Sequence, residues 1–301
     1  MNLHGVLLPL TTPFDGDAVA PARLGAAISR YETHGVTGYV VLGSTGETAL
    51  LDEDEKIALL SAAREAIPAT KTMLAGVGLE STAATVRLAC RAAEAGADGL
   101  LVLTPFFFRS RMTADALVRH FTAVADAAPV PIVLYNVPAH TSLVIPPTVV
   151  ETLARHPNVI GLKDSSGDVP WMLDVLGRVP ADFRVLCGSA TAFLPALVSG
   201  AVGGILAIAD ALPELAVRLF QCHIEGRAED ALHLQKALVT VTRLVLGSHG
   251  VAGIKAVMDL RGLAGGDPRL PLLPVVAAER AALAGEIDRL VALRVLDRVR
   301  I

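Results

Sequence analysis

The stretch that decides the fold is Val159-Ile160-Gly161-Leu162-Lys163-Asp164, an apolar run that ends abruptly in a lysine. The chain has five lysines, and the other four lie in or beside helix-like patterns. A lysine at the end of a buried strand cannot extend into solvent, and desolvation disfavours its charged ammonium form. A neutral buried amine is a nucleophile for carbonyl carbons, which is how Schiff-base catalysis begins. The alternative is that Lys163 is simply ion-paired with the neighbouring Asp164.

Seven further apolar runs are spaced along the chain, and each is followed by a helical pattern. The expected strands, besides the one that contains Lys163, are Gly5–Leu10, Gly38–Leu42, Thr72–Gly76, Gly99–Leu103, Ile132–Asn136, Arg184–Cys187 and Gly203–Ile208. Continuous apolar runs, as opposed to alternating patterns, are typical of parallel strands buried on both faces. Eight strand–helix units predict an α/β fold, the (β/α)8 TIM barrel. The main competitor is a doubly wound open sheet, which usually carries a glycine-rich nucleotide loop after its first strand, and this sequence has no such loop.

The strand pattern stops after about residue 226. Helices are expected over Arg227–Leu246, Gly250–Gly262 and Val275–Val299, with a loop between Gly262 and Pro274. We therefore expect residues 1–226 to form the barrel that carries the active site. Residues 227–301 are expected to form C-terminal helices packed on the barrel as part of the same structural unit, either across its outside or between subunits.

Composition excludes several classes of protein. With 52% hydrophobic and 19% charged residues, the chain can build a large core and is not expected to be disordered. The net charge of −4 provides no basic field for nucleic acid. The three cysteines have no paired or metal-like spacing and are expected to be free thiols in a reducing compartment. We see no signal peptide and no apolar run of about 18 residues free of charges and helix breakers, so we expect a cytoplasmic protein without a membrane partner.

In a barrel of this kind the active site lies at the C-terminal ends of the strands. That rule brings together Lys163, Tyr135 and the turn Gly43–Gly46, which contains Ser44 and Thr45. A tyrosine beside a Schiff-base lysine can move protons, and the turn can offer backbone N–H groups and hydroxyls to a carboxylate. Together these groups suit a 2-keto acid, with its ketone at Lys163 and its carboxylate at Ser44 and Thr45.

Each of these features also has a purely structural interpretation. The Gly43–Gly46 segment is also compatible with a plain tight turn, Tyr135 with a core residue, and His140 with a surface residue. Arg109 and Arg111 fit either a solvated loop or a site for a second carboxylate. The histidines form no H-x-H or H-E-x-x-H pattern and the serines no G-x-S-x-G elbow, so the sequence predicts neither a metal site nor a serine hydrolase.

Three motifs carry a family resemblance: Gly43-Ser-Thr-Gly-Glu47, Tyr135-Asn-Val-Pro138 and Gly161-Leu-Lys-Asp-Ser-Ser166. In order and spacing they resemble the dihydrodipicolinate synthase/N-acetylneuraminate lyase family of class I aldolases, and the resemblance covers the whole chain. It implies a homotetrameric TIM barrel, a dimer of dimers, that needs no metal or organic cofactor. It also implies Schiff-base chemistry between pyruvate, or a similar 2-keto acid, and an aldehyde.

The same resemblance assigns roles to individual residues. It implies that Lys163 forms the Schiff base, that Tyr135 transfers protons together with Thr45, and that Ser44 and Thr45 bind the carboxylate. Two more positions, Gly188 and Ile205, match positions that line the pocket through backbone atoms.

Two departures from the synthases of this family bear on the reaction. Those enzymes carry a tyrosine where this chain has Phe107, and that tyrosine completes a proton relay in a neighbouring subunit's site. They also carry an arginine at the place of His140, which grips the carboxylate of the aldehyde substrate; histidine cannot make the same permanently charged, bidentate contact. Both changes favour an aldolase or dehydratase branch. His140 is then free to bond a hydroxyl or act as an acid or base, and Phe107 and its phenylalanine neighbours to line a less polar pocket.

Three functions follow from these features. The first is a lyase that cleaves, dehydrates or condenses a 2-keto acid, such as a 2-keto-3-deoxy sugar acid, at Lys163, and the synthase that condenses pyruvate with aspartate semialdehyde is its alternative. The second is a barrel that binds 2-keto acids with reduced catalysis. The third and weakest is a sugar-phosphate enzyme that uses the loops at Gly188 and Gly203 for phosphate.

Overall fold

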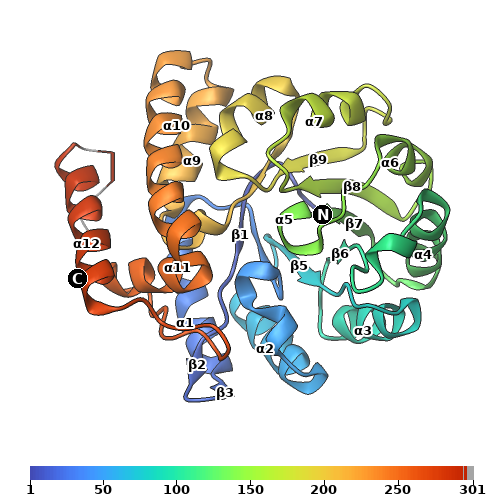
Figure 1. The fold of residues 1–301 in the computed structure, drawn as a ribbon, viewed down its shortest axis with the longest axis horizontal. Helices are drawn as coiled ribbons and strands as arrows, with labels where there is room; N and C mark the ends of the chain where they lie inside the picture. Colours follow the sequence, from blue (N-terminus) through green and yellow to red (C-terminus); the bar gives the residue numbers. More distant parts are fainter. Residues whose placement is uncertain (294, 297–301) are drawn as a thin grey trace.

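The structure, a computed structural model that describes residues 1–293 and 295–296, contains a closed barrel of eight parallel strands (Figure 1). The strands follow one another around the barrel in the order β1-β10-β9-β8-β7-β6-β5-β4, and β4 pairs with β1. Their bounds are β1 Gly5–Pro9, β4 Gly38–Val41, β5 Thr72–Gly76, β6 Gly99–Leu103, β7 Ile132–Asn136, β8 Val159–Asp164, β9 Arg184–Cys187 and β10 Gly203–Ile205. A short antiparallel hairpin, β2 Phe14–Asp15 and β3 Ala18–Val19, follows β1. Closure between β1 and its two neighbours confirms the TIM barrel and excludes the open sheet.

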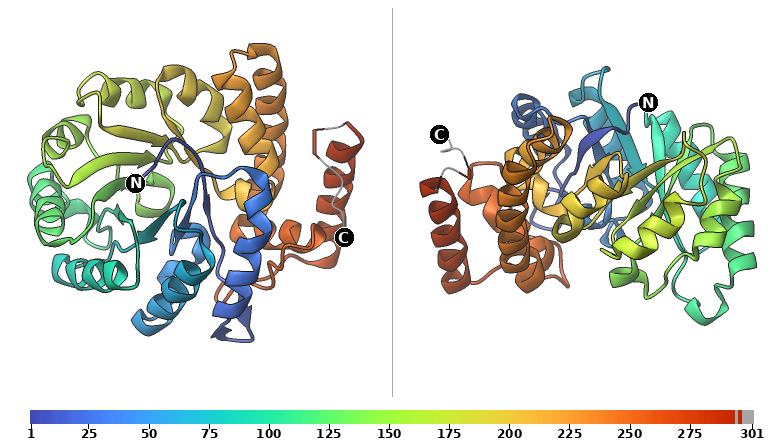
Figure 2. Two further views of the ribbon diagram at one scale, coloured as in Figure 1. Left: turned by 180° about the vertical axis from the view of Figure 1, so that it is seen from behind. Right: turned by 90° about the horizontal axis from the view of Figure 1, so that it is seen from above.

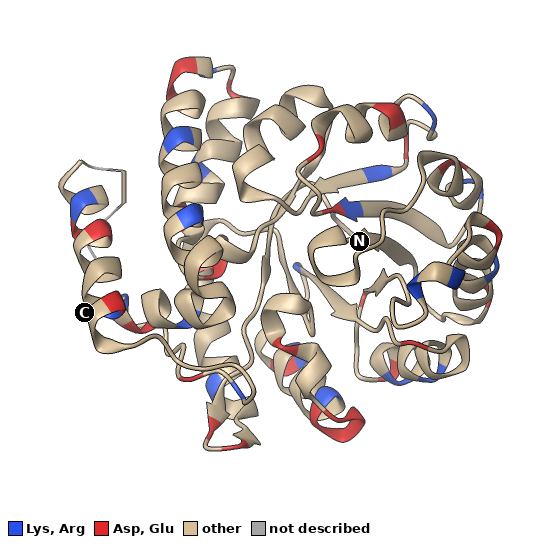
Figure 3. Ribbon diagram, viewed as in Figure 1, with Lys and Arg blue, Asp and Glu red and all other residues tan. Residues whose placement is uncertain are grey.

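Helices surround the barrel, and several begin at a capping residue. Asp52 and Glu55 form a reciprocal capping box at the start of α2, and Ser81 and Thr113 cap α3 and α4. The helices that follow the strands are α1 Pro21–Tyr31, α2 Glu53–Ala66, α3 Thr82–Glu94, α4 Ala114–Ala127, α5 Pro138–Thr141, α6 Pro147–Leu153, α7 Val169–Leu176, α8 Phe193–Ser199 and α9 Pro213–Ile224. Charged residues lie on these outer helices and on the loops that join them to the strands (Figure 3).

Side chains that alternate along the strands separate two layers of core. The inner layer fills the barrel with one or two residues from each of seven strands. Its strand residues are Leu7, Val40, Leu74, Leu101, Val133, Tyr135, Leu186 and Ile205. The intervening residues, such as Leu134 and Leu162, face the helices and join the larger outer cluster. Burial on both faces is the physical reason that the strands are apolar without interruption.

Several expected bounds shift by a few residues, and three expectations about the elements are wrong. The last strand ends at Ile205, not at Ile208, because the chain turns into a 3₁₀ segment at Ala207–Asp210 whose Asp210 carboxylate accepts a hydrogen bond from the backbone N–H of Thr11. The segment after Asn136, expected to be a loop, contains the one-turn helix α5. The last helix, expected to reach Val299, ends at Ala292; residues 294 and 297–301 lie outside the described part of the chain.

The C-terminal part consists of α10 Ala228–Thr242, a π-helical turn Arg243–Gly247, α11 Ser248–Leu260 and α12 Ala277–Ala292. In both views of Figure 2, α12 lies at the edge of the molecule, beyond α10 and α11. The contacts of α10 with α8 and α9 join this part to the barrel, while the proposed division at residue 226 stays a prediction.

One helical stretch, Ala228–Leu260, is long and apolar enough by length and composition to cross a membrane. The sequence predicted no membrane-spanning stretch, because charges and glycines interrupt each apolar run. In the structure, however, the helix continues through Arg243 and Gly247. Core helices of globular proteins pass the same test. Here Leu234 and Leu238 pack into the outer core, and the helix is kinked at Gly250, where φ is 57°.

Candidate active site

A cavity of about 710 Å³ opens at the C-terminal ends of the barrel strands. It is lined by seven of the eight site residues expected from the sequence. These are Ser44, Thr45, Tyr135, His140, Lys163, Gly188 and Ile205. Topology brings them together, because the C-terminal ends of parallel strands meet at one end of the barrel.

Lys163 and Tyr135 are neighbours across two paired strands. The β7–β8 register places Tyr135 directly beside Lys163, so both side chains point into the barrel. Lys163 is 4% exposed, and its Nζ lies 4.2 Å from the centroid of the Tyr135 ring. The amine is therefore buried next to the phenol, at the floor of the cavity.

Asp164, the alternative partner of Lys163, points to the other face of β8. Its carboxylate accepts hydrogen bonds from Asn136 Nδ2 at 2.7 Å and from the Ser166 hydroxyl at 2.7 Å. Burial raises the pKa of Asp164, and the hydrogen bonds from Ser166 and Asn136 oppose this shift. The ion-pair interpretation of the lysine is thus wrong, and Asp164 instead fixes the segment that follows the strand.

Tyr135 is 5% exposed and carries a perturbed phenol. Burial alone would raise the pKa of Tyr135, but the positive charge of Lys163 and hydrogen bonds with Ser44, Ser165 and Lys163 outweigh burial and lower that pKa. The Ser44 and Tyr135 hydroxyl oxygens are 3.5 Å apart, a long contact that leaves room for a ligand atom to compete. A phenol with a lowered pKa gives up its proton more readily, as proton transfer requires.

The buried carboxylate of Glu47, the residue that ends the turn containing Ser44 and Thr45, stabilises this turn. Residues Ser44–Gly46 form a 3₁₀ turn, which ends at Glu47 in the left-handed conformation with φ 55°. The Glu47 carboxylate is fully buried, lies 2.5 Å from Lys255 Nζ of α11, and accepts a hydrogen bond from the backbone N–H of Arg269 at 2.8 Å. A non-glycine residue with positive φ is strained unless its surroundings fix it, and this buried pair provides that constraint.

The two backbone positions also lie where the sequence places them. Gly188 follows β9, and a Cβ atom added there would come within 3.0 Å of Lys163 Cε. Ile205 ends β10 and is fully buried in the inner layer of the core. Both positions therefore shape the cavity around the lysine.

His140 and Phe107 differ in their position. His140, on the short helix α5, lines the cavity, and desolvation followed by the charge of Lys163 lowers its pKa. Phe107 is 74% exposed, packs edge-on against Phe108 and does not line the cavity of its own chain. The expected place of Phe107 in a substrate pocket therefore stays a prediction, since the resemblance puts this position in a neighbouring subunit's site. Arg109 and Arg111 of the same loop are exposed, in agreement with the solvated-loop interpretation.

Sequence reasoning missed the second wall of the cavity. The end of α10, the π-helical turn and the start of α11 contribute Thr242, Arg243 and His249, and Leu272 and Leu273 of the following loop extend that wall. The C-terminal helices were expected on the outside of the barrel or between subunits. No local motif marks these residues, since the rule that locates active sites concerns only the strand ends.

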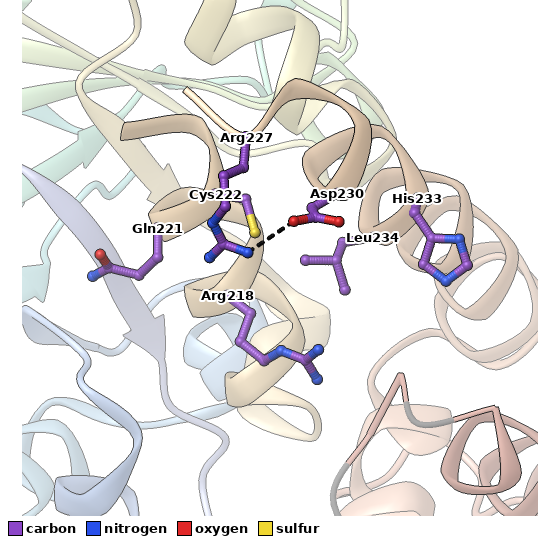
Figure 4. Close-up of a pocket in the computed structure, with 7 residues that line it drawn as sticks. All are labelled: Arg218, Gln221, Cys222, Arg227, Asp230, His233 and Leu234. Atoms are coloured by element: carbon purple, nitrogen blue, oxygen red, sulfur yellow. Dashed lines mark hydrogen bonds and ion pairs between the residues drawn. The ribbon is translucent and has the colours of Figure 1, made fainter. Parts of the chain in front are cut away.

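A smaller cavity of about 210 Å³ lies between α9 and α10 (Figure 4). Its Arg227 is paired with Glu225 and Asp230, and Arg218 donates a hydrogen bond to the Val295 carbonyl. In residues 1–293 and 295–296, no group of three or more His, Cys, Asp or Glu side chains is arranged to hold a metal ion.

Comparisons with known proteins agree with this geometry. The sequence matches the dihydrodipicolinate synthetase family over residues 2–290. It is 35% identical over 286 residues to a 4-hydroxy-tetrahydrodipicolinate synthase of Exiguobacterium sp.. The aligned region covers 95% of this chain and 97% of that protein. It is 34% identical to an uncharacterised DapA-like lyase of Halobacterium salinarum, over 95% of this chain and 94% of that protein.

Two solved structures illustrate the likeness of the fold. A dihydrodipicolinate synthase of Bacillus anthracis superposes with a TM-score of 0.91 at 28% identity, covering 96% of this chain and 98% of that one. A prophage protein of E. coli K12 from the dihydrodipicolinic acid synthase family, solved in complex with pyruvate, gives a TM-score of 0.90 at 28% identity with the same coverage.

Proposed function

We propose that this chain, which belongs to the dihydrodipicolinate synthetase family of pyruvate-dependent Schiff-base lyases, forms its Schiff base through Lys163. The observation that carries the proposal is the buried Lys163 amine beside the Tyr135 phenol, on paired strands and within one cavity with Ser44 and Thr45. The reaction is the cleavage or formation of a carbon–carbon or carbon–oxygen bond next to a 2-keto acid. The chemistry requires no metal or organic cofactor, because the protonated imine itself accepts the electron pair.

Four side chains of the cavity take part in forming the imine. The 2-keto acid binds with its carboxylate at the hydroxyls and N–H groups of Ser44 and Thr45. The Lys163 amine adds to the ketone carbon, Tyr135 passes a proton to the carbinolamine oxygen, and water leaves to give the imine. This assignment makes Lys163 the nucleophile, Tyr135 the proton carrier and Thr45 its partner.

Cleavage then proceeds with a balanced transfer of electrons and protons. The hydroxyl of the sugar-acid tail loses its proton to Tyr135, which acts as the base after it has given its own proton to the carbinolamine oxygen. The carbon–carbon bond then breaks, and its electron pair moves into the imine, which gives an enamine and an aldehyde. The enamine carbon takes up a proton to become the pyruvate imine, and water hydrolyses this imine to free Lys163 and pyruvate. Condensation is the same sequence in reverse.

The aldolase or dehydratase branch is the first candidate, acting on a 2-keto-3-deoxy sugar acid or a similar compound. Phe107 has no hydroxyl for the proton relay of the synthases, and His140 replaces the arginine that grips the carboxylate of their aldehyde. The second candidate is the synthase reaction of the named relatives, with aspartate semialdehyde as the aldehyde. If the wild-type protein turns over aspartate semialdehyde with pyruvate faster than it cleaves 2-keto-3-deoxy sugar acids, this second candidate is favoured.

Borohydride trapping with pyruvate tests the proposal. Borohydride adds hydride to the imine carbon and leaves a stable secondary amine, which peptide mass mapping locates. We expect one adduct on Lys163, and none in a folded Lys163→Met variant. An unmodified Lys163 in the folded wild-type protein would refute the assignment. An adduct without hydrogen–deuterium exchange at the pyruvate methyl group would identify the catalytically reduced binding barrel.

The assembly and location of the protein are part of the same proposal. We infer a homotetramer, a dimer of dimers, from the family resemblance, and the exposed Phe106, Phe107 and Phe108 side chains supply an apolar surface for a second copy. The free thiols of Cys90, Cys187 and Cys222 suit the reducing cytoplasm. Light scattering coupled to gel filtration measures the mass in solution, and a mass of one chain would contradict the tetramer.

A further inference from the structure

We propose that Thr242 and Arg243, with His249 beside them, form the subsite for an anionic group at the far end of the second substrate. The inference rests on the proposed function, since it assumes that the carbonyl end of the substrate reacts at Lys163. It adds the class of that substrate, namely an aldehyde, or the sugar acid made from it, that carries a second acidic group remote from the reacting carbon.

The size of the cavity shows that pyruvate does not fill it. Cavities of roughly 300–1,000 Å³ hold ligands of drug size, and this cavity has about 710 Å³. It is bounded by the strand ends on one side and by α10, the π-helical turn and α11 on the other. A ligand that spans both walls has its reacting carbonyl at Lys163 and its opposite end at the C-terminal helices.

Thr242 has a buried hydroxyl at the cavity wall. The residue is 7% exposed and lines the cavity, and its Oγ1 atom has no hydrogen-bond partner in the described part of the chain. A buried hydroxyl without a partner costs about 1–3 kcal/mol, so each such group calls for an explanation, and at Thr242 a ligand atom in the cavity supplies one. Thr242 therefore points to a polar group of the substrate at this end of the cavity.

Arg243 supplies the charge. It follows Thr242 at the first position of the π-helical turn, and within residues 1–293 and 295–296 no carboxylate lies within ion-pair distance of its guanidinium. Most other arginines of the described chain are paired, including Arg227 in the smaller cavity of Figure 4. Short π-helical turns inside α-helices are frequent at functional sites, and here the turn places consecutive Thr242 and Arg243 side chains on one cavity wall.

The charged groups that line the cavity favour an anionic ligand. The described lining residues include Lys163, Arg243, His140 and His249 but no aspartate or glutamate. Because Lys163 and Arg243 line this cavity and no carboxylate of the described chain does, the cavity attracts anions. His249 lies 3.7 Å from Glu279 of α12, and that carboxylate itself does not line the cavity. Leu272 and Leu273 add an apolar surface to the same cavity.

The subsite also accounts for the histidine at position 140. Where the synthases of the family hold the aldehyde's carboxylate with an arginine at that position, this chain offers an imidazole whose pKa is lowered by desolvation and by Lys163. Arg243 provides a permanent positive charge from a different element. Recognition of the acidic end has thus moved from the loop after β7 to the end of α10.

The test uses 2-keto acids that differ only at their far end. Straight-chain 2-oxo monocarboxylates of five, six and seven carbons are compared with the 2-oxo dicarboxylates of the same lengths, and the concentration for half-maximal borohydride trapping on Lys163 is measured for each. At one or more lengths we expect the dicarboxylate to trap at a concentration about tenfold or more below its partner, as a hydrogen bond to a charged group implies. The preference should disappear in Arg243→Met and weaken in Thr242→Val.

Lys236→Met is the matched control, because it removes one positive charge from an exposed position on the same helix. It should keep the full preference for the dicarboxylates. Equal trapping of both series in the wild-type protein, or a preference that survives in Arg243→Met, would overturn the inference. Pyruvate reports separately on the proposed function, since its trapping depends on Lys163 and should be the same in all these variants.

Discussion

Replacing Lys255 by methionine should destabilise the protein strongly and loosen the turn that binds the carboxylate. Lys255 and Glu47 are both fully buried and lie 2.5 Å apart, and the ammonium also sits 4.6 Å from the centre of the Phe14 ring. Desolvation lowers the pKa of Lys255 and the Glu47 carboxylate opposes that shift, so burial is costly for the pair even when it is intact. Methionine fills similar space but leaves Glu47 with the Arg269 N–H as its remaining hydrogen-bond donor in the described part of the chain.

The expected loss is about 3–5 kcal/mol, the range for removing one partner of a buried ion pair. For a chain of this size it corresponds to a fall of roughly 10 °C in the midpoint of thermal unfolding. Lys236→Met removes the same charge from an exposed position and should change stability by less than about 0.5 kcal/mol. Circular dichroism during heating measures all three proteins.

The double variant Glu47→Gln/Lys255→Met separates pairing from packing. If the penalty arises from the unpaired carboxylate, neutralising it should restore most of the lost stability, because apolar or neutral replacements of buried pairs are often tolerated. The pyruvate concentration for half-maximal trapping should rise in Lys255→Met, since the Ser44–Thr45 turn loses its support. A single variant as stable as Lys236→Met, or a double variant whose loss equals the sum of the single losses, would refute the reasoning.

Three further predictions concern the site and the buried titratable groups. Tyr135→Phe should lower the turnover number by about 10²–10⁴, the usual range for a lost acid–base group, whereas trapping with pyruvate, measured over hours, should still label Lys163. Gly188→Ala should slow adduct formation on Lys163, because the added Cβ would collide with Ser165 Oγ and come within 3.0 Å of both Lys163 Cε and the Asp164 carbonyl oxygen; trapping time courses and thermal midpoints separate the effect on Lys163 from a loss of stability. Burial raises the pKa of Asp210 to about 6 from 3.8 and lowers the pKa of His120 to about 4 from 6.5. Asp210 therefore contributes stability below pH 4 that is lost as pH rises through 6, and His120 contributes stability above pH 6.5 that is lost as pH falls toward 4, each by about 3 kcal/mol. In urea titrations between pH 4 and 6.5, stability should rise more steeply with pH in Asp210→Asn and less steeply in His120→Gln than in the wild type, and unchanged slopes would contradict the assignment.

The barrel could be predicted because each of its strands carries its own signal. Runs such as Thr72–Gly76 and Ile132–Asn136 are apolar on both faces, and the structure has them with the same bounds. The last strand was predicted too long because Leu206–Ile208 is equally apolar in a 3₁₀ turn, and only the contact between Asp210 and Thr11 ends the strand. That contact joins residues 199 positions apart in the chain, so local sequence cannot reveal it.

The site was predictable to the extent that it lies on strand ends. Lys163, Tyr135, Ser44 and Gly188 follow from the strand assignment and the barrel rule alone. Arg243 does not, because no topological rule places a helix that follows the last strand, and its side chain is typical of any exposed helix position. The place of Phe107 stays a prediction, since a single chain does not determine which surface a second copy covers.

The two walls of the cavity are encoded in separate stretches of the gene. The residues that perform the chemistry all precede the exposed Gly226 turn, and those assigned to recognition of the far end all follow it. A single crossover at this turn would exchange the recognition wall between relatives while leaving the reaction apparatus intact. The Glu47–Lys255 contact spans that junction, so functional chimeras are limited to parents that share both residues.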